Sequence, residues 1–127
     1  MIIKTFYKVC GRPVCSANFT TSNNNKRYCS DSCRESHRQR NARIRFLKRI
    51  HDYFGNKCVI CGFDDVRALQ IDHVNGGGMK ENKKRNNGIV AGGLQFYKIV
   101  LREINSGKYQ LICANCNWIK RHTNNEK

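Results

Sequence analysis

Eight cysteines constrain this chain of 127 residues more than any other feature of its sequence. They form two groups of four, namely Cys10, Cys15, Cys29 and Cys33, then Cys58, Cys61, Cys113 and Cys116. Paired thiolates a few residues apart are the usual ligands of tetrahedral zinc. The opening residues, MIIKTFYKVC, lack the apolar run of a secretory signal, so we expect an intracellular, reducing compartment in which metal binding is favoured over disulfides. Because a short polar chain buries little apolar core, we expect one structural Zn²⁺ in each group.

The second group contains two CxxC pairs, separated by the 51 residues 62–112. That separation is longer than in a simple zinc ribbon, so the ion is expected to clamp both ends of a larger insert. Four thiolates leave no open coordination position, which makes this zinc structural rather than catalytic. Thiol exchange and buried free cysteines remain alternatives. The first group begins with a wider Cx4C pair and predicts a zinc finger over residues 1–33, which either contacts phosphates, selects a target or only braces the chain.

Positive charge is the second strong feature, because 24 Lys and Arg face 9 Asp and Glu and give a formal charge of +15. A surplus of this size favours a polyanionic partner, most simply DNA, although a basic surface that only aids solubility is an alternative. The basic side chains that we expect to contact DNA are Arg34, Arg38, Arg40, Arg43, Arg45, Lys80, Lys83, Lys84, Arg85, Lys120 and Arg121. No apolar run approaches the length needed to span a bilayer, so we expect no membrane partner.

Hydrophobic periodicity predicts a small α+β fold. A basic linking helix is expected over residues 34–55, with Ser32 and Glu35 as a capping box and Gly55 as its terminator. Its second half carries an apolar stripe that can pack on the segment 56–127. Within that segment we expect strands over 68–74 and 109–112 and helices over 94–105 and 117–122, with a long Gly-, Asn- and Lys-rich insert over 75–93.

Three polar residues lie within the frame of the second cysteine group. Asp72 and His73 end the expected strand LQIDH between the two CxxC pairs, and Asn117 follows the last cysteine directly in LICANCNWIK. In this combination, residues 56 to about 121 resemble the HNH endonuclease family, also called the ββα-metal nucleases. The zinc-clamped members from phages and mobile elements look closest.

The resemblance implies a treble-clef-like nuclease domain over 56–127 that hydrolyses phosphodiester bonds in DNA. It implies His73 as the general base, and Asp72 and Asn117 as the ligands of a catalytic Mg²⁺ or Mn²⁺. It also implies a phage or mobile-element setting within a host cell, with a homodimer or a phage or mobile-element protein as a possible partner. The motif's middle asparagine is absent, since Lys108 and Tyr109 stand in that region, and Asn105 is the candidate replacement.

Other interpretations of these residues stay open. Asp72 and His73 are alternatively a satisfied polar pair at the end of a strand, and Asn117 is alternatively a helix N-cap. The main rival for the whole chain is a noncatalytic nucleic-acid-binding protein that zinc holds together.

Overall fold

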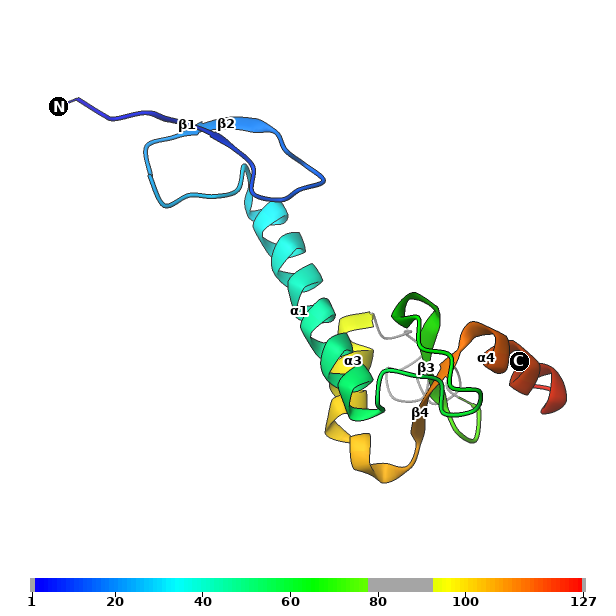
Figure 1. Cartoon of the computed structure of the whole chain (residues 1–127). Coiled ribbons are helices and arrows are strands. Elements are labelled where there is room, and N and C mark those ends of the chain that lie inside the picture. The colour runs from blue at the N-terminus through cyan, green and yellow to red at the C-terminus, as the bar shows by residue number, and fades with distance from the viewer. Residues whose placement is uncertain (1, 78–92, 127) are drawn as a thin grey trace. The chain divides into compact units, whose positions relative to one another are not determined.

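The computed structural model describes residues 2–77 and 93–126 (Figure 1). The chain forms two compact units, Met1–Ala42 and Arg43–Lys127. Helix α1, Asp31–Tyr53, begins in the first unit and ends in the second. Across the described part of the chain, no helix combines the length and the apolar character that crossing a membrane requires.

The first unit contains a short hairpin followed by the start of α1. Strands β1, Phe6–Val9, and β2, Asn18–Thr21, pair antiparallel, with Phe6 opposite Thr21. Cys10 follows β1 directly. Its amide donates to the carbonyl of Ala17 at 2.8 Å, which extends the pairing of the hairpin by one more bond. The hairpin therefore places the first cysteine pair next to the residues that lead into the helix.

The start of α1 differs from the predicted capping box. The helix begins at Asp31, and the Ser30 hydroxyl accepts a hydrogen bond from the amide of Cys33 at 3.2 Å, so Ser30 is the cap and the prediction of Ser32 was wrong. Glu35 does not reach back to the helix start, because its carboxylate accepts hydrogen bonds from Arg38 and Gln39. Ser30 and Ser32 lie on either side of the first helical residue, and pattern alone did not separate them.

The second unit is built around a two-stranded antiparallel sheet. Strand β3, Leu69–His73, pairs with β4, Tyr109–Cys113, in a register that sets Leu69 opposite Cys113 and His73 opposite Tyr109. Helix α3, Gly93–Arg102, precedes β4, and helix α4, Ala114–Thr123, follows it directly (Figure 1). The described part of the unit also contains two 3-10 turns, η1 over Val66–Ala68 and η2 over Ile104–Ser106. The expected strands are confirmed, and the fold is α+β. The helix expected over 94–105 is present, but it ends at Arg102 and the 3-10 turn η2 follows it.

The core of this unit consists of two clusters of buried residues. Ile50 of α1 is fully buried and packs with Val100 of α3 and Tyr109 of β4. A second cluster joins Leu111 and Ile112 of β4 to the cysteines of the adjoining metal centre. The predicted packing of the second half of the basic helix against the following segment is therefore confirmed.

The end of α1 also follows the prediction. Gly55 has a φ of +83°, and the amide of Asn56 donates to the carbonyl of His51 at 2.9 Å. Together with the bond from Gly55 N–H to the carbonyl of Asp52, this is a Schellman ending, in which a glycine adopts the left-handed conformation at low cost.

Candidate metal centres and the strand–helix interface

The sulfurs of the first cysteine group converge on one point. The Sγ atoms of Cys10, Cys15, Cys29 and Cys33 all lie within 4.8 Å of one another. The Sγ of Cys29 lies 3.7 Å from that of Cys15 and 3.6 Å from that of Cys33. Tetrahedral zinc with Zn–S bonds of about 2.3 Å requires sulfurs about 3.8 Å apart, whereas a disulfide requires about 2.05 Å. The spacing therefore fits a zinc site with four cysteine ligands and not disulfides.

The surroundings of these thiols give them different pKa values. Hydrogen bonds from the Ser30 hydroxyl and the Arg12 guanidinium lower the pKa of Cys33 to about 6. The thiol contacts of Cys29 with its neighbours, Cys33 first, raise its pKa to about 12. Four sulfurs this close cannot all carry negative charge by themselves, so a divalent cation is needed to hold all four as thiolates.

The second cysteine group has the same geometry. The Sγ atoms of Cys58, Cys61, Cys113 and Cys116 lie within 4.8 Å of one another, and those of Cys61 and Cys113 are 3.7 Å apart. These residues fit a second structural Zn²⁺, as the sequence predicted, with no open position for catalysis.

A tight turn presents the first pair of this group. Gly62, with a φ of +79°, donates its amide to the carbonyl of Cys58 at 2.9 Å. The amide of Val59 donates to the carbonyl of Leu111 at 3.0 Å, which fastens the turn to β4. A segment more than 50 residues away in sequence is thus held at the end of that strand.

The thiols of the second group are also unequal. Burial opposes the ionisation of Cys58, but hydrogen bonds from the backbone amides of Cys61, Cys113 and Ile60 outweigh it, and the pKa of Cys58 is about 6. Burial and the neighbouring sulfurs raise the pKa of Cys116 to about 12. As in the first group, a bound divalent cation would allow all four cysteines to be thiolates at once.

Asp72 lies on the face of β3 that α4 covers. Its Oδ2 accepts a hydrogen bond from Gln110 Nε2 at 2.8 Å and lies 3.0 Å from Lys120 Nζ. The side chains of Asp72 and Lys120 are each only 11% exposed. The Lys120 ammonium also donates to the carbonyl of His73 at 2.9 Å and to the carboxylate of Glu126 at 2.9 Å. Lys120 is thus engaged within the chain, which differs from the solvent-facing phosphate contact that we expected.

Asn117 lies on the same interface, one helical turn before Lys120. It is half-buried, and its Nδ2 donates to Gln70 Oε1 at 2.6 Å. The N-cap of α4 is Cys113, whose Sγ accepts from the amide of Cys116, so α4 starts three residues before Asn117. The alternative of Asn117 as an N-cap was therefore wrong, and so was the predicted start of this helix.

Asp72 and Asn117 come from facing elements but are held by separate partners. Asp72 is held through its Oδ2 by Gln110 and Lys120, whereas Asn117 is held through its Nδ2 by Gln70. Carboxylate and amide oxygens are donors that Mg²⁺ and Mn²⁺ accept, with water and substrate phosphate completing the shell. The donor set is suitable for such an ion.

His73 lies on the opposite face of β3 from Asp72, as strand alternation predicts. Its ring centroid is 5.0 Å from that of Tyr109 and 6.0 Å from that of Phe96 on α3. Pairing of the two strands continues past it, because the amide of Val74 donates to the carbonyl of Lys108 at 2.9 Å. The imidazole is thus oriented by two aromatic rings at the end of the strand.

Asn105 does not lie in the turn after β3. It belongs to η2, and its Oδ1 accepts a hydrogen bond from the Tyr53 hydroxyl of α1 at 2.7 Å. The contact that joins the end of β3 to the chain before β4 is instead the backbone bond from Val74 to Lys108.

The basic residues predicted to contact DNA fall into three sets. The arginines of α1, namely Arg34, Arg38, Arg40, Arg43 and Arg45, are all exposed. Two of them take part in surface ion pairs on the same helix, Arg34 with Asp31 and Arg38 with Glu35. Arg121 of α4 is exposed. The remaining set, Lys80, Lys83, Lys84 and Arg85, lies outside the described residues.

Sequence reasoning missed the partners that hold the candidate site. Gln70 and Gln110 bind Asn117 and Asp72, and Glu126 binds Lys120. The signal for Gln70 was present, because Gln70 and Asp72 alternate with apolar residues and so share one face of the strand.

We compared the chain with known proteins. No protein-family model, no curated protein and no solved structure matches it. The functional assignment therefore depends on the residues and the geometry described above.

Proposed function

We propose that this protein is a metal-dependent DNA endonuclease of the HNH type. One observation supports this most: the four-cysteine centre that joins β4 to the Cys58 turn also begins α4, and it sets Asn117 on the helix that covers Asp72 of β3. Oxygen donors that lie 45 positions apart in the sequence thereby meet at one strand–helix interface. The high positive charge suits a DNA substrate.

In this proposal each residue has a separate task. The ring of His73, held by Tyr109 and Phe96, takes the proton from the attacking water, a role that suits an imidazole near neutral pH. Asp72 and Asn117 hold the divalent ion through their oxygens. When bound, that ion supplies stabilisation of negative charge on the phosphate and the leaving oxygen. The exposed arginines of α1 contact phosphates without reading sequence.

A noncatalytic nucleic-acid-binding protein is the second candidate, and the Lys120 contact favours it. The ammonium lies 3.0 Å from Asp72 and already neutralises the carboxylate that an ion would need. In this candidate the Asp72–Lys120 pair is structural, and the protein binds nucleic acid without cleaving it under any divalent ion.

Plasmid cleavage separates the two candidates. Supercoiled DNA is incubated with zinc-loaded protein and added Mg²⁺ or Mn²⁺, and nicked and linear products are measured. The nuclease proposal expects cleavage by the wild type and its loss in His73→Ala and Asp72→Asn. Asp64→Asn, an exposed aspartate in the loop before β3, and His37→Ala, in the other unit, are the matched controls and should cleave normally. Equal cleavage by His73→Ala and the wild type would remove the assigned base.

A further inference from the structure

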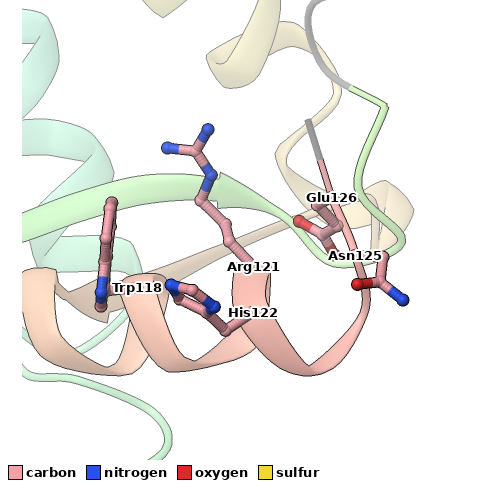
Figure 2. A pocket seen from close by; sticks show the side chains of 5 residues that line it. All are labelled: Trp118, Arg121, His122, Asn125 and Glu126. Atoms are coloured by element: carbon pink, nitrogen blue, oxygen red, sulfur yellow. The ribbon is translucent and has the colours of Figure 1, made fainter.

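The outer side of α4 carries a pocket that the proposed reaction does not use. It has a volume of about 280 Å³ and is lined by Trp118, Arg121, His122, Asn125 and Glu126. Figure 2 shows the rings of Trp118 and His122 next to each other along the helix, with their centroids 5.3 Å apart and their planes at 68°. Asn125 and Glu126 lie past the helix end and close the other side of the pocket (Figure 2).

Packing does not explain the indole in this pocket. Trp118 is 64% exposed, although it is among the largest apolar side chains available to the chain. Its neighbours Asn117 and Lys120 face β3, so Trp118 lies on the side of α4 away from the sheet. The exposed indole offers a flat apolar face on which a planar ligand can stack.

The charges around the indole restrict that ligand. Arg121 is exposed and lines the same pocket as Trp118 and Glu126. The one carboxylate of the pocket, on Glu126, is paired with Lys120 at 2.9 Å, which it shares with Asp72. A ligand with a π-face and a negative charge is therefore matched on both counts, and a nucleotide in a DNA strand has both.

The pocket also adjoins the candidate catalytic interface. Lys120 joins the carboxylates of Asp72 and Glu126. Glu126 packs on the turn after β3, where a Cβ at Gly76 would lie 2.9 Å from its Cδ. A DNA strand with one base held against Trp118 would therefore pass next to the proposed catalytic interface.

We infer that this pocket holds an unpaired nucleobase of single-stranded or branched DNA, stacked on Trp118, with the adjacent phosphate near Arg121. A base inside a duplex is stacked on both faces and cannot offer a free face to an indole, so the pocket selects DNA with unstacked bases. The inference deepens the proposed function, on which it rests for the choice of DNA, and it names the substrate class.

The chain provides its own probe, because Trp118 is its only tryptophan. Zinc-loaded protein without added Mg²⁺ or Mn²⁺ is titrated with a short oligothymidine while the indole fluorescence is recorded. Saturable quenching is expected with this strand and not with a duplex of equal length. An abasic strand with the same number of phosphates is the matched control for charge, and it should leave the fluorescence unchanged. Equal quenching by the abasic strand or by the duplex would overturn the inference.

Variants test the same point by fluorescence anisotropy of a labelled oligothymidine. Loss of one base–aromatic stack predicts binding weaker by about 5- to 150-fold for Trp118→Ala. Trp118→Phe should recover part of that loss, and Ile119→Ala, an exposed neighbour outside the pocket, should bind as the wild type does. Zinc content and far-UV circular dichroism test whether each variant is folded. If Trp118→Ala does not fold, Arg121→Gln replaces it and should also bind the strand more weakly. Unchanged affinity in the folded variant, whichever of the two is used, would overturn the inference.

These outcomes are independent of cleavage. Quenching by the unpaired strand without any plasmid cleavage would support the inferred nucleobase site and contradict the proposed function. Cleavage without quenching would support the proposed function and contradict the inferred nucleobase site.

Discussion

The contact between Lys120 and Asp72 is the interaction in the second unit whose strength can best be measured. The two charged atoms are 3.0 Å apart and both side chains are only 11% exposed. At an effective dielectric constant of about 20, that distance gives a gross attraction of about 5 kcal/mol. Removing one partner of a buried pair costs about 3–5 kcal/mol, and the remaining solvent contact places this pair near the lower end. We therefore expect Lys120→Met to lower the free energy of unfolding by about 3 kcal/mol.

A double-mutant cycle isolates the pair from its other contacts. Lys120→Met, Asp72→Asn and the double variant are unfolded in urea with zinc present, and far-UV circular dichroism follows the transition. The second substitution should cost much less in the background of the first, with a coupling energy of about 1–2 kcal/mol. Lys48 and Asp52 of α1 provide the control, since they lie 2.8 Å apart but remain largely exposed, and their coupling should be far weaker. Equal coupling in the two pairs would refute the reasoning from burial.

Four further predictions follow from single contacts. Lys120→Met should bind Mn²⁺ more tightly than the wild type by electron paramagnetic resonance, since it removes a competing cation from Asp72. Cys113→Ser should lower the zinc content by mass spectrometry from two ions per chain to one, and helical content should fall because the same sulfur caps α4. Ser30→Ala should destabilise the first unit by about 1 kcal/mol in urea unfolding, because the amide of Cys33 loses its acceptor. Burial holds the pKa of His51 below its ordinary value, so the unfolded chain takes up the proton first as the pH falls. The free energy of unfolding should therefore decrease as the pH falls below about 6.5. His51→Gln should make that decrease smaller in urea unfolding measured from about pH 7 to 5.

Prediction from sequence succeeded where periodicity or spacing was strong. The cysteine spacing indicated both four-cysteine clusters, and the alternation around Leu69 and Ile71 indicated β3. It failed at helix starts, where a choice between chemically similar caps decides the boundary. Ser30 rather than Ser32 caps α1, and a cysteine sulfur rather than an amide caps α4.

The contacts of the candidate site were harder to predict, for a physical reason. Lys120 was expected on the surface because a lysine near a basic terminus usually faces water. Its burial depends on Asp72 from a strand 48 positions earlier and on Glu126 from the residues after α4. No local pattern encodes the contact with Asp72, because that residue reaches Lys120 only through the tertiary packing of α4 against β3.

Cys113 has three roles at once, since it ends β4, caps α4 through its sulfur and belongs to the second metal centre. Folding of this region would therefore depend on a metal ion bound at that one sulfur atom. In a chain without zinc, the strand end, the helix start and the Cys58 turn would all lose their shared anchor together. Metal availability would then act as a switch on the whole second unit, because the two oxygens proposed to carry the chemistry depend on that anchor for their position.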